Sequence, residues 1–181
     1  MRYLFLIIYY GFATYLPDSY SPIFGRISNW LRIFCCRFIF KKCGRVSNIN
    51  RCAYFGTGKD IEMGDYSSIG AHSKLPNDIK IGKYVMMAPE VLVFNRNHRF
   101  SDPTLPFCEQ GMTEPRTVVI GDNVWLGERA IITAGRHIAP NTVVAAGAVV
   151  TKDFPESVIV GGNPAKVIRN TYNTEKQEPK H

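Results

Sequence analysis

The stretch IGDNVWLGERAIITAG, residues 120–135, places an aliphatic residue at every sixth position: Ile120, Leu126 and Ile132. The same spacing recurs on both sides, at Met63, Ile69, Leu75, Ile81, Met87, Val93, Ile138, Val144 and Val150. This period matches neither an α-helix, whose period is about 3.6 residues, nor a simple strand, whose period is about two. It is typical of a solenoid in which each hexapeptide supplies one short strand and one turn.

The repeat predicts a mainly β fold built as a triangular coil. Three hexapeptides would close one turn, and successive turns would stack at the strand spacing of about 4.8 Å. The aliphatic residue would point inward. The next residue is mostly small, as at Gly64, Gly70 and Gly127, and we expect it to let the chain bend at the corner, where a positive φ is often needed. Residues 156–170 would close one end of the coil and the N-terminal segment the other.

The composition is that of one globular domain, with 181 residues of which 45% are hydrophobic and 20% charged. The net charge of +7 lies entirely in residues 1–51, where eight Lys and Arg accompany Asp18 as the one acid. Residues 52–181 carry fourteen charges of each sign and are neutral. The repeat region therefore lacks the basic surface of a nucleic-acid-binding domain, and we expect no nucleic acid among the partners.

The basic N-terminal segment also holds twelve of the 22 aromatic residues. Two interpretations fit it: a helical cap on the main domain, or contact with an anionic membrane surface, where aromatic and basic side chains meet the headgroups. A spanning helix is not expected, because the apolar run over residues 3–16 is shorter than the roughly 20 residues required. No clean signal-peptide cleavage site follows this run. We expect a cytoplasmic protein, with peripheral attachment to the inner face of the membrane under the second interpretation.

The hexapeptide rhythm stops at VLVFNRNHRFSDPTLPF, residues 91–107. The next repeat position after Val93 is Ile120, 27 positions later, which is not a multiple of six. We expect the chain to leave the coil here, to form a protruding loop over about residues 95–117, and to rejoin the coil out of phase. The prolines and glycines of the loop favour an ordered arm. His98 lies at its root.

Two blocks resemble the hexapeptide acyltransferases: IGDNVWLGERAIITAG (120–135) and VVAAGAVVTKDFPESVIVGGNPAKVIRN (143–170). Over residues 46–170 the chain is similar to galactoside, maltose and polysaccharide O-acetyltransferases. GRISNWLRIFCCRFIFKKCG (25–44) resembles, more weakly, the leading segment of capsular and colanic-type sugar acetyltransferases. The resemblance implies a left-handed parallel β-helix after a helical segment over residues 1–45. It also implies a homotrimer whose sites lie between subunits, and we expect a disordered tail over residues 171–181.

The resemblance implies transfer of an acetyl group from acetyl-CoA to a carbohydrate hydroxyl, without a metal. Counted without a gap from MAPEVLVFNRNH, His98 falls on the position of the catalytic histidine. An imidazole with a pKa of about 6.5 suits a general base, and a backbone N–H at a repeat corner would hold the oxyanion. Asn95 and Asp102 could orient the imidazole or touch the acceptor, or they could only stabilise the loop.

The donor site implied by the resemblance lies downstream of the loop. Trp125 and Gly127 would lie beside the reacting centre, and Ala146 and Gly147 would let pantetheine approach the backbone closely. The phosphates of CoA would be held by Thr151, Lys152, Lys166 and Arg169. The chain departs from the family at Thr133, Arg136 and Glu128, and the asparagine that binds the acceptor in galactoside enzymes has no clear counterpart.

We expect the acceptor to be a sugar of a bacterial surface polysaccharide or its precursor. Transfer to a sugar amine or to the hydroxyl of serine would use the same chemistry. A γ-type carbonic anhydrase would need three histidines at a zinc ion, and only His98 lies in the loop. A non-catalytic scaffold would have no use for the TKD and NPAKVIR motifs. The five cysteines lack CxxC spacing and predict reduced thiols of a cytosolic protein.

Overall fold

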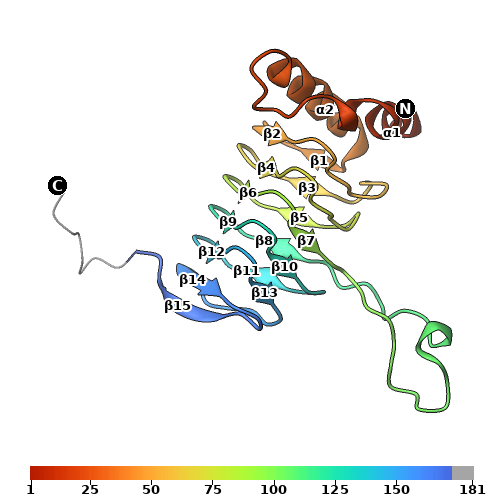
Figure 1. Cartoon of the computed structure of the whole chain (residues 1–181), viewed down its shortest axis with the longest axis vertical. Coiled ribbons are helices and arrows are strands. Elements are labelled where there is room, and N and C mark those ends of the chain that lie inside the picture. The colour runs from red at the N-terminus through yellow and green to blue at the C-terminus, as the bar shows by residue number, and fades with distance from the viewer. Residues whose placement is uncertain (173–181) are drawn as a thin grey trace.

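A computed structural model describes residues 1–172. Two helices, α1 (Arg2–Gly11) and α2 (Gly25–Ile39), flank the short 3-10 helix η1 (Ala13–Tyr15) and precede a column of short strands (Figure 1). The strands lie on three faces of a triangular coil, and neighbouring coils pair in parallel. A second 3-10 helix, η2 (Phe107–Glu109), lies within the arm.

The three faces follow one another along the chain. The first face holds β1 (Lys42–Cys43), β3 (Glu62–Met63), β5 (Lys80–Ile81), β8 (Val119–Ile120) and β11 (His137–Ile138). The second face holds β2 (Asn48–Ile49), β4 (Ser68–Ile69), β6 (Met86–Met87), β9 (Trp125–Leu126), β12 (Val143–Val144), β14 (Val158–Gly161) and β15 (Lys166–Asn170). The third face holds β7 (Leu92–Val93), β10 (Ile131–Ile132) and β13 (Val149–Val150), and isolated bridges at Tyr54 and Lys74 extend it.

The aliphatic positions of the repeat form the core, as predicted. All twelve are buried, and each stacks on its counterpart in the next coil, as Ile120 does between Ile81 and Ile138. This arrangement buries one continuous apolar column and leaves the polar strand residues on the surface. The fold is the left-handed parallel β-helix that the resemblance implied.

The corners correct one expectation. Positive φ does not occur at the small residue directly after each aliphatic but three positions after the aliphatic, as at Tyr66, Tyr84 and Asn123. The small residue is required for a different reason. A Cβ atom on Gly127 would lie 2.5 Å from the backbone nitrogen of Ala146 in the next coil. Close approach of stacked coils, and not the bend itself, excludes larger side chains there.

The arm leaves the coil after β7 and returns as β8, at the corner between the third and the first face. Although its length is not a multiple of six, β8 takes the next place on the first face, and Ile120 pairs with Ile81 as in any other turn. We expected the chain to rejoin the coil out of phase, because the spacing from Val93 to Ile120 is not a multiple of six. In the structure the chain rejoins the coil in register. The arm is an insertion in a single corner, and it projects away from the column (Figure 1).

The two helices cover the open end of the first coil (Figure 1). Tyr9, Cys36 and Ile39 are buried in one continuous core with Ile49 and Phe55 of the first coil. The structure thus shows the helical cap, the first of the two interpretations of the basic segment. Within residues 1–172, no helix combines the length and the apolar character that crossing a membrane would require.

The opposite end of the coil closes with the antiparallel pair β14 and β15. Beyond it, the N–H of Thr171 donates to the carbonyl of Ser157 at 2.8 Å, and its hydroxyl donates to the carbonyl of Asn141 at 3.0 Å. The hydroxyl of Tyr172 also contacts Asn141. The tail predicted to be disordered therefore begins with two hydrogen-bonded residues. The rest of that prediction concerns residues 173–181, which lie outside the described residues.

Candidate active site

The arm is an ordered loop whose two limbs are joined by backbone contacts. The N–H of Thr113 donates to the carbonyl of Asn97 at 2.8 Å, and an antiparallel bridge joins His98 to Met112. His98 therefore lies on a stem with a defined backbone, and its side chain is exposed. This is the placement that a reactive imidazole needs, since its backbone is fixed while the ring stays accessible.

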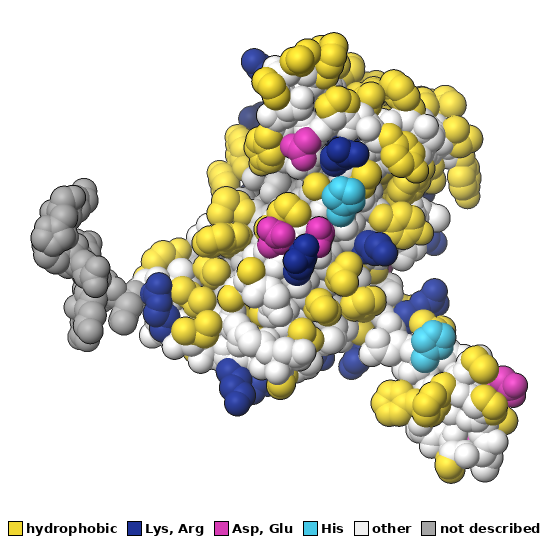
Figure 2. Space-filling model, in the orientation of Figure 1, with side chains coloured by type: hydrophobic (Ala, Val, Ile, Leu, Met, Phe, Trp, Pro, Cys, Tyr) yellow, Lys and Arg dark blue, Asp and Glu magenta, His cyan; other side chains and the backbone are white. Residues whose placement is uncertain are grey.

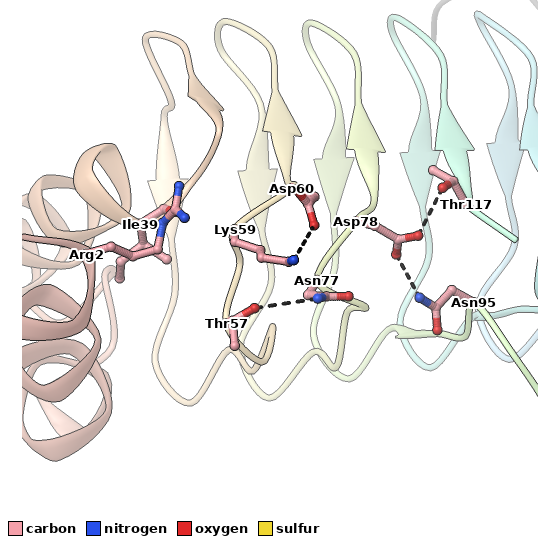
Figure 3. Close-up of polar contacts among 9 residues, drawn as sticks. All are labelled: Arg2, Ile39, Thr57, Lys59, Asp60, Asn77, Asp78, Asn95 and Thr117. Carbon is pink, nitrogen blue, oxygen red and sulfur yellow. Dashed lines mark hydrogen bonds and ion pairs between the residues drawn. The ribbon is translucent and has the colours of Figure 1, made fainter. Parts of the chain in front are cut away.

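One carboxylate joins the two limbs where the arm meets the coil (Figure 3). The amide nitrogen of Asn95 donates to Oδ1 of Asp78 at 2.8 Å, and the hydroxyl of Thr117 donates to Oδ2 at 2.9 Å. Asn95 precedes the stem and Thr117 follows it. We name these three residues the arm clasp. Because both oxygens of the carboxylate are engaged, the separation of the limbs is set by one rigid group.

Asp102 has a local structural partner. Its Oδ1 accepts hydrogen bonds from the N–H of Thr104 at 2.9 Å and from the hydroxyl of Thr104 at 2.6 Å. These hydrogen bonds lower the pKa of the Asp102 carboxyl. Of the roles left open for this residue, the structure shows stabilisation of the loop. Asn95, the other candidate, takes part in the arm clasp and also lines the cleft described next.

A cleft of about 610 Å³ opens at the corner between the third and the first face, between the cap and the arm. Its polar walls carry two further contacts, between Lys59 and Asp60 at 3.7 Å and from the amide of Asn77 to the hydroxyl of Thr57 at 3.5 Å (Figure 3). The cleft is lined by Tyr54, Gly56, Thr57, Lys59, Asp60, Leu75, Pro76, Asn77, Asp78, Asn95, Arg96 and Pro115. An exposed ring among amides, hydroxyls and charges suits a hydroxyl-rich ligand.

The identity of the cleft residues gives no signal in the sequence, but their spacing does. Lys59 and Asp78 are not among the predicted site residues, because polar residues are ordinary at repeat corners. Cys43 pairs with Met63, twenty positions on, whereas Met63 pairs with Ile81, eighteen positions on. The two additional residues lengthen the corner of the first coil that forms one wall of the cleft.

The residues expected to bind the donor divide into two groups. The first group lies on the second face and on the corner between the second and the third face. The N–H of Gly127 donates to the carbonyl of Val144 at 2.8 Å, which stacks the two coils of this group. Its members are Trp125 in β9, Gly127 directly after it, Ala146 and Gly147 one coil further on, and Lys166 and Arg169 in β15.

The second group, Thr151 and Lys152, follows β13 at the corner between the third and the first face. This is the corner that also carries the cleft and the arm. The ammonium of Lys152 lies 5.6 Å from the ring centroid of Phe154, which orients it. In a triangular coil the second face is opposite this corner. A single chain therefore does not bring Trp125 and His98 together.

Free backbone amides lie beside the first group, as expected for repeat corners. Glu128 and Ala146 occupy equivalent positions on successive coils and are exposed. Within residues 1–172, neither N–H donates to a carbonyl or a side chain, whereas the neighbouring N–H of Gly147 donates to the carbonyl of Glu128 at 2.8 Å. Two unpaired donors in line along the corner can bind a carbonyl or an oxyanion.

The unusual residues of the fourth coil are accommodated. The hydroxyl of Thr133 donates to the carbonyl of Val150 at 2.9 Å, and Arg136 lies 3.4 Å from the carboxylate of Asp153.

All five cysteines are unpaired, and burial raises the pKa of Cys36 well above its usual value. In the described part of the chain, no three His, Cys, Asp or Glu side chains gather as a metal site would require.

Comparison with known proteins places the chain in a family. The model of the bacterial transferase hexapeptide (six repeats) family matches residues 117–152. The crystal structure of a maltose O-acetyltransferase from Clostridium difficile 630 is similar at 30% identity and a TM-score of 0.71, covering 95% of this chain and 87% of that one. A galactoside acetyltransferase in complex with coenzyme A has a TM-score of 0.76 over 99% of this chain and 88% of that one. At 24% identity, this second structure shows the fold alone.

Among curated proteins, the chain is similar to the putative lipopolysaccharide biosynthesis O-acetyl transferase WbbJ of Escherichia coli (strain K12). The two are 32% identical over 64% of this chain and 60% of that protein. The chain covers between 58% and 68% of the length of the first three curated relatives that it matches.

Proposed function

Since the chain belongs to the hexapeptide-repeat acetyltransferases, we propose that it moves an acetyl group from acetyl-CoA to a hydroxyl of a carbohydrate. The observation that carries this proposal is the position of His98. It lies on an ordered stem, with a polar cleft towards the cap and Lys152, a proposed donor-binding cation, further along the same corner. Acceptor and donor could therefore approach the imidazole from opposite ends of the coil.

His98 would act as the general base. A neutral imidazole can accept the proton of the acceptor hydroxyl. The acceptor oxygen bonds to the thioester carbon as it loses that proton. The C–S bond then breaks while the imidazolium returns the proton to the sulfur of CoA. A free corner amide, that of Glu128 or Ala146, would hold the oxyanion between the two steps. Lys152, Lys166 and Arg169 would pair with the phosphates of CoA.

We infer that the complete site forms between two copies of the chain. His98 and Lys152 belong to one corner of the β-helix, whereas Trp125 and Ala146 lie on its opposite side. A closed ring of three copies would set the corner of each against the second face of the next, and every copy would contribute to two sites. A homotrimer is therefore the proposed assembly.

We propose that the acceptor is a sugar of a bacterial surface polysaccharide or of its precursor. The similarity to a putative lipopolysaccharide O-acetyl transferase supports this class. The cleft supports it independently, because Tyr54 offers a ring for stacking and Lys59, Asp60 and Asn77 offer hydrogen-bonding groups. We place the reaction in the cytoplasm, where unpaired cysteines such as those of this chain stay reduced.

The test is an acetyl-transfer screen over monosaccharides, oligosaccharides, sugar amines and lipid-linked glycans, read by chromatographic detection of released CoA. His98→Asn should lower the turnover of the best acceptor by about 10²- to 10⁴-fold, the range for a general base. His137→Asn, an exposed histidine on the first face, is the matched control and should keep its activity. Retention of most activity by His98→Asn would remove this residue from the mechanism.

A further inference from the structure

The outward surface of the cap is apolar over both helices. Exposed large side chains form what we name the outer cap face, and Figure 2 shows hydrophobic side chains gathered over this end of the molecule. In α2 the exposed positions recur every three or four residues, opposite the buried Ser28, Arg32 and Cys35. The outer cap face consists of Tyr3, Leu4, Ile7, Ile27, Trp30, Phe34 and Phe38.

The aromatic rings of the outer cap face are already ordered. Trp30 stacks on Phe34 with ring centroids 5.4 Å apart, and Phe38 stacks on Phe5 of α1 at 4.1 Å. Phe34 also meets Phe38 edge to face. A row of mutually packed rings has little side-chain entropy left to lose when a partner covers it. The outer cap face is therefore prepared for binding, although it packs against nothing else within residues 1–172.

The charges around the outer cap face are fewer than the composition suggests but are of one sign. Lys41 and Lys42 pair with Glu62 at 2.9 and 3.0 Å, and Arg32 is buried. Arg26 and Arg37 stay exposed on α2. Neither helix contains an acidic residue. A large apolar face with arginines and no acid is complementary to anionic headgroups above an acyl interior.

We propose that the outer cap face binds peripherally to an anionic lipid surface. Ile7, Ile27 and Trp30 enter the boundary between headgroups and acyl chains, and Arg26 and Arg37 pair with lipid phosphates. Neither helix can span a bilayer, so both lie in its plane. Because Lys41, Lys42 and Arg32 are already engaged within the protein, insertion of apolar side chains contributes more than charge does.

This orientation has a consequence for the acceptor, which rests on the proposed function, whereas the binding itself does not. The cleft lies between the cap and the arm, on the side of the arm that faces the cap (Figure 3). A glycan carried on a lipid would thus reach the cleft from the membrane, and acetyl-CoA would arrive from the opposite end of the coil.

Tryptophan fluorescence tests the binding, because the chain has only two tryptophans. One lies on the outer cap face and the other on the second face of the β-helix. Trp125→Phe leaves Trp30 on the outer cap face, and Trp30→Phe leaves Trp125 on the second face. On addition of phosphatidylglycerol vesicles, without acetyl-CoA, the emission of Trp30 should shift to the blue and that of Trp125 should stay unchanged. An unchanged Trp30 would overturn the proposal.

Co-sedimentation with phosphatidylglycerol vesicles tests whether the apolar residues of the outer cap face make the contact. Ile7→Ser with Ile27→Ser, at sites that are 70% and 64% exposed, should lower vesicle binding at least ten-fold. Ile168→Ser, at a site 62% exposed at the far end of the coil, is the matched control and should bind as the unaltered chain does. Most of the binding should survive 1 M salt, where the Debye length is about 3 Å. Complete loss in salt would overturn insertion in favour of charge alone.

A second copy of the chain is the competing occupant of the outer cap face. In that case light scattering without vesicles would show an assembly larger than three copies, which Ile7→Ser with Ile27→Ser would reduce. Trp30 emission would then be blue already, and vesicles would not change it. This combination of results would overturn lipid binding and show that the outer cap face is an interface between copies of the chain.

Discussion

The carboxylate of Asp78 accepts one hydrogen bond from each limb of the arm, at 2.8 Å from Asn95 and at 2.9 Å from Thr117. We infer that Asp78 is a positioning residue that acts through the backbone of His98. Asp78→Asn keeps the size of the side chain but removes its charge. The amide oxygen can still accept from Asn95, and the amide nitrogen can donate to the hydroxyl of Thr117, but both hydrogen bonds lose their charge assistance and weaken. A displacement of about 1 Å at a reacting group can cost roughly 100-fold in rate.

Asp78→Asn should therefore lower kcat by roughly 10- to 100-fold while the KM for acetyl-CoA stays unchanged. Asp78→Ala should lower kcat further, because both hydrogen bonds are lost, so the asparagine variant acts as a partial rescue. Steady-state kinetics and thermal unfolding of both variants check this. A raised KM for the acceptor with an unchanged kcat would instead make Asp78 a binding group of the cleft.

At the scale of single elements, α2 is held on the coil by Arg32. Its guanidinium is buried and donates to the carbonyl of Ile49 at 2.6 Å and to the hydroxyl of Ser19 at 2.9 Å. It also donates to the carbonyls of Ala13, Leu16 and Pro17 at 3.2 to 3.4 Å. One side chain thus joins α2, η1 with the segment that follows it, and the first coil.

Arg32→Ala should lower the free energy of unfolding by roughly 3 kcal/mol, because several buried carbonyl groups lose their charged donor. Arg26→Ala, an exposed position on the same helix, is the matched control and should change it by less than about 0.5 kcal/mol. Chemical denaturation followed by circular dichroism measures both. Equal values for the two variants would show that the cap does not depend on Arg32.

At the scale of the whole molecule, the predicted site residues occupy opposite sides of the β-helix. His98→Ala removes the proposed base from one corner, and Ala146→Trp blocks the proposed donor wall on the opposite side. His98→Ala alone should lose about 10²- to 10⁴-fold in turnover, and Ala146→Trp alone should lose activity because it excludes the donor. In trimers mixed at random from equal amounts of both, about a quarter of the sites would combine an unaltered His98 with an unaltered donor wall.

Activity should therefore return on mixing, after denaturation and joint refolding, to about a quarter of that of the unaltered protein. Mixing without subunit exchange is the control and should restore nothing. If no activity returns although mixed trimers are shown to form, both residues act within one chain, and the site does not lie between copies.

The hexapeptide repeat predicted much of the element order, because each short strand depends on its own six residues and on the equivalent residues one coil away. Burial of Ile120, Leu126 and Ile132 could thus be read from their spacing alone. The position of the bend could not. Tyr66 and Asn123 adopt positive φ although neither is glycine, since the stacking of coils imposes the corner and tolerates these residues there.

By itself, the sequence determined the coil, its core and the corner from which the arm projects, since these follow from a local period and from the place where it breaks. Only the tertiary structure decided what the N-terminal segment covers, which residues clasp the arm, and on which side of the coil each predicted site residue lies. The contacts of Asp78 with Thr117, 39 positions away, and of Arg32 with Ile49, seventeen positions away, have no fixed spacing in the sequence. They arise because stacking brings distant corners together, and no period in the chain encodes which polar side chains then meet.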